Sequence, residues 1–213
     1  MLSAGWPLYA ALLQAPAPEL PVPTSEAPPV VAPASPLTRR ERIELLAGIH
    51  VQGGGSTWRG DGTGGVGLTI GVRLFRVITP FVQARLGYAG VDQRLLIPLV
   101  IGVTLGVPIP VRGPLGEAPR AWPYLRAAFV HQHEESVAAV ADNLAGALLG
   151  IGGGIRHRAG ALLAAGCDFT LLSSARARLL LGPEVSFLLL GYSVGPSLYG
   201  HVGINLGGSF RLL

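Results

Sequence analysis

Residues 65–74 read GVGLTIGVRL, and they alternate without a break between aliphatic side chains and glycine or polar residues. The aliphatic positions are Val66, Leu68, Ile70, Val72 and Leu74. Successive side chains of a β-strand point to opposite faces, so a period of two predicts a strand with one aliphatic face and one small, polar face. The same period begins near residue 40 and returns at intervals to the end of the chain.

Working outward from this stretch, we expect eight strands of the same kind. They cover residues 43–52, 65–74, 79–91, 95–107, 122–132, 155–168, 179–190 and 198–212. The strand at 155–168 alternates least clearly, and Pro98 predicts a bulge near the start of the strand at 95–107. Eight antiparallel strands with short connections are enough to close a barrel over residues 40–213.

Composition places the aliphatic face of these strands against lipid. Hydrophobic residues make up 49% of the 213 residues, charged residues only 13%, and the mean hydropathy is +0.48, whereas a soluble domain carries about a quarter charged residues. The 31 glycines and 18 prolines disfavour a bundle of membrane helices. The expected fold is therefore all-β: an eight-stranded antiparallel up-and-down transmembrane β-barrel. The alternative is a soluble lipocalin-like carrier, which is apolar inside.

The polar face consists mainly of small residues, which suits a crowded lumen, and it carries a few ionisable side chains. We expect these to form a lumen charge network: Glu44, His50, Arg73, Arg85, Arg126, Glu184, His201 and Arg211. An isolated buried arginine is costly, so the two glutamates should each pair with arginines, and a structural network is favoured over an ion pathway. Aromatic residues near strand ends, including Trp122, Tyr124 and Tyr199, are expected in the core or in an interfacial girdle.

The first 39 residues differ from the rest of the chain. Residues 1–17 have an apolar centre followed by Ala15-Pro16-Ala17, which makes them a candidate signal peptide, although no Lys or Arg precedes that centre. Residues 18–39 are rich in proline, and we expect a disordered linker. The basic residues are all arginine and are scattered, and Cys167 is the only cysteine, so neither nucleic-acid binding nor an internal disulfide is expected.

A second group of polar residues surrounds the longest expected connection, at residues 133–154. This loop-base cluster comprises His131, His133, Glu134, Glu135, Arg156, His157 and Arg158. The favoured interpretation is that its glutamates pair with its arginines across neighbouring strands. Two alternatives stay open: histidines with a carboxylate that bind a divalent ion, and a hydrolytic set of His133, Glu134 and Ser136. We therefore assign no catalytic residue, no metal ligand and no cofactor.

Three segments carry a resemblance to known proteins. They are the last strand, 199–213 (YGHVGINLGGSFRLL), and the segments 129–135 (FVHQHEE) and 154–158 (GIRHR). Together with the alternating strands, they resemble the small outer-membrane β-barrel proteins of Gram-negative bacteria, of the OmpA, OmpX and OmpW kind, and most closely uncharacterised outer-membrane barrels of myxobacteria. The chain departs from that group at its end, because the group usually ends on an aromatic residue and Phe210 lies three residues early.

The resemblance implies a bacterial outer-membrane location, with both termini in the periplasm and the connections near 53–63, 92–94, 133–154 and 191–197 outside the cell. The implied partners are the lipid bilayer, lipopolysaccharide, the barrel assembly machinery and a small solute. The implied role is structural, binding or small-solute passage, without enzymatic activity. The alternative is an outer-leaflet lipid-modifying or metal-dependent hydrolase that uses His131, His133 and Glu134. The apolar stretch 136–150 is expected to form a short helix at the barrel mouth.

Overall fold

The computed structural model describes residues 43–56, 61–91, 93–110, 120–151, 154–174, 176–191 and 198–212. They belong to one compact unit, Leu37–Leu213. The candidate signal peptide at 1–17 and the proline-rich linker at 18–39 lie outside the described residues.

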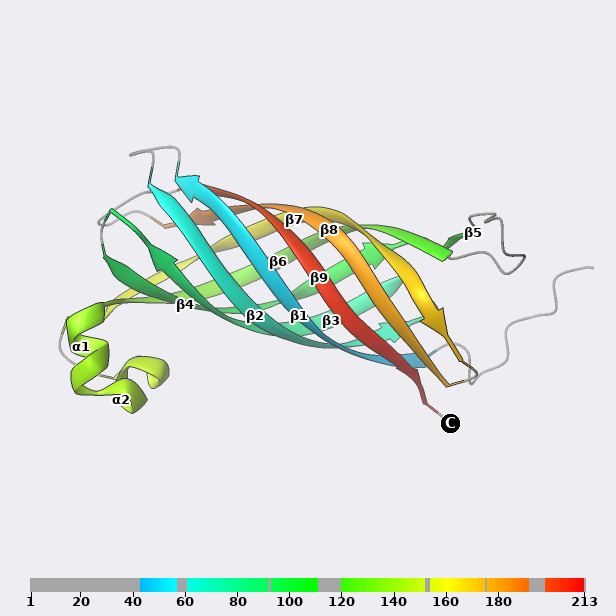
Figure 1. Ribbon diagram of the computed structural model, residues 1–213, viewed down its shortest axis with the longest axis horizontal. Coiled ribbons are helices and arrows are strands. Elements are labelled where there is room, and N and C mark those ends of the chain that lie inside the picture. Colours follow the sequence, from blue (N-terminus) through cyan, green and yellow to red (C-terminus); the bar gives the residue numbers. More distant parts are fainter. Residues whose placement is uncertain are drawn as a thin grey trace, which may run out of the picture. The chain divides into compact units, whose positions relative to one another are not determined.

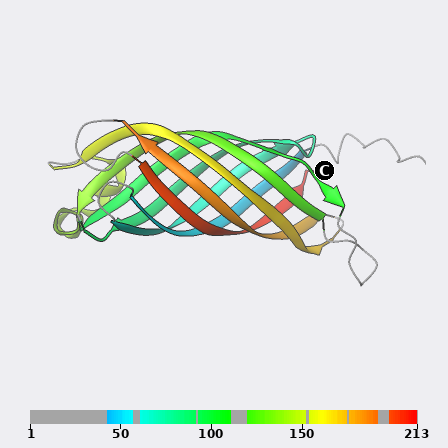
Figure 2. The same ribbon diagram turned by 90° about the horizontal axis from the view of Figure 1, so that it is seen from above.

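Antiparallel strands form a single closed sheet (Figures 1 and 2). The strands are β1 (Ile43–Ser56), β2 (Gly62–Leu74), β3 (Ile78–Ala89), β4 (Arg94–Gly106), β5 (Ile109–Pro110), β6 (Arg120–Ser136), β7 (Arg156–Ser173), β8 (Ala177–Leu190) and β9 (Leu198–Arg211). Each long strand pairs with its neighbours in sequence, β4 pairs with β6, and β1 pairs with β9 to close the ring. The two-residue β5 only extends the edge beside β6. The expected eight-stranded up-and-down barrel is confirmed.

The strands run further than the alternation predicts. Gly53, Gly54 and Gly55 belong to β1 and pair with β2 on one side and β9 on the other. Glycine satisfies the backbone ladder as well as any residue but carries no side chain, so a run of glycines hides a strand from a pattern of hydrophobicity. The bulge expected at Pro98 is wrong, because the register between β4 and β6 continues through it. A register shift lies instead on β7, between Thr170 and Leu172.

The aliphatic face of the strands points outward. Leu68, Ile70 and Val202 are 62%, 63% and 64% exposed, whereas their polar-face neighbours are buried or half-buried. Even β7, which alternates poorly in sequence, follows the rule, since Leu162 is 1% exposed and Leu163 is 61% exposed. This orientation contradicts the lipocalin-like carrier, whose aliphatic side chains would fill the interior.

Two short helices, α1 (Val137–Asp142) and α2 (Leu144–Leu149), connect β6 to β7 at one end of the barrel, as expected for residues 136–150 (Figure 1). Ser136 Oγ accepts a hydrogen bond from the Ala139 amide at 3.2 Å and caps α1. Asn143 caps α2 in the same way, and Gly150 ends it at a φ of 71°. Among the described residues, no helix has the length and apolar character needed to span a membrane.

The barrel has two distinct ends. The end of the barrel that carries α1 and α2 is where β1, β3, β6 and β8 end and where β2, β4, β7 and β9 begin, and we call it the helix end. Ile43, where β1 begins, and Arg211, where β9 ends, lie at the opposite end, which we call the termini end.

Candidate functional site

The middle of the lumen is organised around one carboxylate, Glu184 on β8, which is 1% exposed. Its Oε2 lies 3.0 Å from Nη1 of Arg126 and accepts a hydrogen bond from the Tyr124 hydroxyl at 2.9 Å. Its Oε1 lies 3.9 Å from Nη2 of Arg85 and 4.0 Å from Nε2 of His50. One buried negative charge is thus shared by groups from β1, β3 and β6, which offsets much of the cost of burying them.

Glycine on the inward face makes room for these long side chains. A Cβ placed on Gly67 would lie 2.9 Å from Cγ of Arg85, its partner in register on β3. A Cβ placed on Gly203 would lie 2.6 Å from Cε1 of His50. A barrel of this size has an interior that side chains just fill, so each long residue needs a small one beside it. This requirement explains why the polar face is rich in glycine.

A second carboxylate, Glu44 on β1, organises the termini end. It lies 3.1 Å from Arg178, 3.8 Å from Arg73 and 4.0 Å from Arg211. Trp122, which is 1% exposed, lies between two of these arginines, with guanidinium carbons 5.0 Å (Arg73) and 5.2 Å (Arg178) from its ring. Such cation–π contacts add to the ion pairs and fill the lumen with an indole ring. This end of the barrel is plugged.

Sequence reasoning did not assign Arg178, Asp168, Tyr124 or Trp122 to these networks. Arg178 falls just before the expected strand 179–190, and Asp168, 3.8 Å from Arg73, lies on the strand that alternates poorly. Tyr124 and Trp122 were expected in the core or in a girdle, and both lie inside the lumen; so does Tyr199. The inward parity of Tyr124 on its strand was the signal that could have found it.

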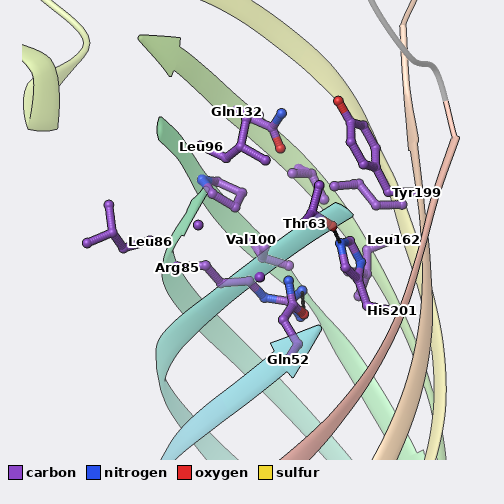
Figure 3. Close-up of a pocket in the computed structure, with 15 residues that line it drawn as sticks. Gln52, Thr63, Arg85, Leu86, Leu96, Val100, Gln132, Leu162, Tyr199 and His201 are labelled. Carbon is purple, nitrogen blue, oxygen red and sulfur yellow. Dashed lines mark hydrogen bonds between the residues drawn. The ribbon is translucent and has the colours of Figure 1, made fainter. Parts of the chain in front are cut away.

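An apolar layer crosses the lumen on the helix side of the Glu184 network, which the sequence did not predict. The buried cluster that forms it consists of Phe81, Val100, Val130, Leu162, Ala164, Leu188, Leu190 and Tyr199. Figure 3 shows Val100, Leu162 and Tyr199 around one small cavity, with Arg85 and Gln52 on its other side. His201 also lines this cavity, and its Nε2 lies 3.0 Å from the Thr63 hydroxyl. The lumen therefore has ion pairs at the termini end and in the middle, an apolar layer beyond them, and the buried Glu134–Arg158 ion pair at the helix end.

Three cavities that the described residues line inside the barrel are small. The one in Figure 3 has a volume of about 20 Å³. One beside Arg73 and Tyr124 has about 50 Å³, and one beside Leu46 and Asn205 has about 70 Å³. Because one water needs roughly 10–15 Å³ measured this way, these spaces hold from one to a few waters each.

The alternation of the strands divides the loop-base cluster between two faces. Glu134 and Arg158 point into the lumen and form an ion pair at 3.1 Å, with Gln132 donating to the same Glu134 oxygen at 2.8 Å. Arg156, half-buried, lies in register with Glu134, and Glu135, buried, lies in register with Leu95.

The histidines of that cluster lie on the other face. His131, His133 and His157 occupy positions that alternate with the inward residues and are half-buried or exposed. His133 and Glu134 therefore point to opposite sides of β6, and Ser136 caps α1. This separation argues against the hydrolytic set of His133, Glu134 and Ser136, because the members of such a set must contact one another.

No protein-family profile matches this sequence, and no curated protein matches it either. Among solved structures, the chain is similar to Neisserial surface protein A, with a TM-score of 0.52 and 9% identity over 80% of this chain and 97% of that one. The fold is that of a small outer-membrane β-barrel.

Two further outer-membrane barrels are similar to a lesser degree. The N-terminal β-barrel domain of Pseudomonas aeruginosa OprF matches with a TM-score of 0.41 and 14% identity over 76% of this chain and 96% of that one. Ail of Yersinia pestis matches with a TM-score of 0.39 and 11% identity over 80% of this chain and 98% of that one. The resemblance to small outer-membrane barrels stands, and the closer likeness to myxobacterial barrels stays a prediction.

Proposed function

We propose that this small outer-membrane β-barrel is a sealed anchor, which holds the α1–α2 connection at the cell surface and carries no solute pathway. The observation that carries the proposal is the filled lumen: Glu44, Glu134 and Glu184 are paired with arginines, and three cavities that the described residues line measure only about 20–70 Å³. Its exterior would contact lipid and lipopolysaccharide, and the barrel assembly machinery would insert it.

Two barriers in series support a sealed lumen. At the termini end and in the middle, Glu44 and Glu184 bind arginines that would otherwise line a hydrated path. Between the Glu184 network and the Glu134–Arg158 pair, Val100 and Val130 are 0% exposed, and Leu162 is 1% exposed. Apolar constrictions exclude water and thereby block ions, so either barrier alone impedes conduction. A structural or binding role fits this interior better than small-solute passage.

The first test is electrical. We expect that the full-length protein, refolded in detergent and inserted into planar lipid bilayers, gives no stepwise current, because no continuous aqueous path crosses the lumen. Heat-modifiable gel migration shows that the inserted protein is folded, and a general porin in the same bilayer shows that the measurement detects channels. Reproducible single-channel steps from the folded protein would contradict the sealed-anchor proposal and favour solute passage.

The second test concerns orientation in a Gram-negative host. In a Cys167→Ser background, Ala145→Cys introduces a thiol on exposed α2, and Phe75→Cys introduces one on the exposed turn at the other end. A membrane-impermeant maleimide should label intact cells that carry the first variant only, because α1 and α2 face outward in the proposal. Labelling of the second variant alone would reverse the orientation, and equal labelling after lysis is the control for reactivity.

A further inference from the structure

Three histidines of the loop-base cluster converge on the outer face of the barrel near the helix end. His131 and His133 lie two residues apart on β6, so their rings point to the same side. His157 of β7 lies directly in register with His133. Antiparallel pairing thus brings together three imidazoles from two strands, whereas the carboxylate of Glu134 points into the lumen.

The spacing of the ring nitrogens matches that of metal ligands. One coordinating nitrogen from each ring can be chosen so that all three lie within 4.8 Å of one another. Nδ1 of His157 and Nε2 of His131 are 3.4 Å apart. Two nitrogens bound tetrahedrally to one zinc ion, each at roughly 2.0–2.1 Å, lie about 3.4 Å from each other. The pair therefore already has the separation that a shared ion requires.

A second observation points to a ligand at the same place. Nδ1 of His133 is buried and has no hydrogen-bond partner among the described residues. A buried polar atom without a partner is costly, and a metal ion would satisfy it. The rings of His133 and His157 meet edge to face at a centroid distance of 4.8 Å, His131 lies equally close to His133, and the three rings therefore already contact one another.

We propose that His131, His133 and His157 form a site for a divalent transition-metal ion of the zinc class. Neutral imidazoles are ligands that Zn²⁺, Cu²⁺ and Ni²⁺ prefer over Mg²⁺ or Ca²⁺. Three protein ligands leave a fourth position for water, and His157 is exposed, so an ion can enter from solvent. On β6 the site comes directly after the outward Phe129, where the aliphatic band of that strand ends.

The site also connects to the helical connection. Gly150, which ends α2, packs against the His133 ring so closely that a Cβ there would lie 2.7 Å from either ring nitrogen. An ion held by the three histidines would therefore fix the position of the ring on which the end of the connection rests. Metal binding would order the surface-exposed α1–α2 connection relative to β6 and β7.

The test uses the full-length protein folded in detergent and stripped of metal with a chelator. We expect it to bind one Zn²⁺ per chain in competition with a chromophoric chelator, and to bind Co²⁺ with the strong visible absorption of tetrahedral or five-coordinate cobalt. Because imidazole must be neutral to bind, affinity should fall as the solution is acidified. If saturating Co²⁺ gives no more than the weak absorption of hexaaqua cobalt, the proposal is overturned.

Variants assign the site to its residues. Changes to groups that merely orient a ligand already cost about 10–100-fold in metal affinity, so His131→Asn, His133→Asn and His157→Asn should each cost about 100-fold. His201→Asn, which removes a lumen histidine, is the matched control and should bind Zn²⁺ like the unaltered protein. Heat-modifiable migration checks that each variant folds. Unchanged affinity in the folded cluster variants would overturn the proposal.

A pair of glycine variants tests the same site without removing a ligand. Gly150 and Gly154 both have positive φ, at 71° and 95°, so alanine strains the backbone at either position. Only Gly150→Ala places a methyl group against the His133 ring; a Cβ on Gly154 meets no atom within 4 Å. We expect Gly150→Ala to weaken Zn²⁺ binding about tenfold or more, and Gly154→Ala to leave it unchanged. Equal affinities would contradict the contact between α2 and the metal site.

Discussion

Replacing Glu184 by glutamine should lower the free energy of unfolding by about 3–5 kcal/mol, the usual cost of removing one member of a buried ion pair. Glutamine keeps the volume and can still accept a hydrogen bond from Tyr124, so the packing of the lumen changes little. What is lost is the negative charge beside Arg126 and Arg85, which then remain buried without their counter-charge.

Denaturant unfolding of the protein in lipid vesicles measures this loss. Asp142→Asn is the matched control, because it removes a carboxylate charge from an exposed position on α1 and should change the unfolding free energy by less than about 0.5 kcal/mol. The double variant Glu184→Gln/Arg126→Met should be less destabilised than the sum of its single variants, since each removes the partner of the other. Additive effects would show that the two groups do not interact.

Leu68→Arg should lower the free energy of unfolding by about 2–4 kcal/mol, as expected for an arginine placed at the middle of the lipid-facing side of a barrel. Leu68 lies at the centre of β2 and pairs with Ile49 and Ala84. An arginine there would be far from the membrane–water interface at either end of the strand. The same measurement in vesicles reports the effect.

Val91→Arg provides the comparison, because Val91 is as exposed as Leu68, at 62%, but follows the end of β3. Near the interface the cost of arginine falls to about 0–1 kcal/mol. If the aliphatic face met water instead of hydrocarbon chains, both substitutions would have the same small effect. Equal costs at the two positions would therefore contradict the transmembrane orientation.

The faces of the barrel could be predicted from sequence because the outside and the inside of a membrane barrel are different environments. Lipid outside requires aliphatic residues such as Leu68 and Val202, and a narrow interior requires glycine beside charge. Parity along each strand then assigns every side chain to a face. Glu44, Arg85 and Glu184 could therefore be placed inside before any coordinates were known.

The apolar layer of the lumen was harder to predict by the same argument. In the sequence FLLL at 187–190, parity from Glu184 and Ser186 points Leu188 and Leu190 inward, but both faces are apolar there, so residue type alone does not distinguish lumen from lipid. The pairing of individual arginines with individual glutamates could not be predicted from sequence either, because it depends on the stagger of the strands around the barrel. Arg178 binds Glu44 across β9, a relation that the spacing of residues does not contain.

The metal-site geometry was partly visible in the sequence. His-x-His at 131 and 133 predicts two rings on one face, but the third ring depends on register. A shift of one residue between β6 and β7 would have turned His157 inward and Arg158 outward, exchanging an ion pair for a histidine.

The contacts of Glu184 also bear on the closure of the barrel between its first and last strands. Nδ1 of His50 on the first strand donates a 2.7 Å hydrogen bond to Oδ1 of Asn205 on the last, and Nδ2 of Asn205 in turn donates to the Tyr124 hydroxyl, also at 2.7 Å. That chain of bonds crosses the seam where β1 pairs with β9. If β1 and β9 were unpaired, Glu184 would lack its contacts with His50 and Arg85, so pairing of the first and last strands also completes the charge network of the lumen.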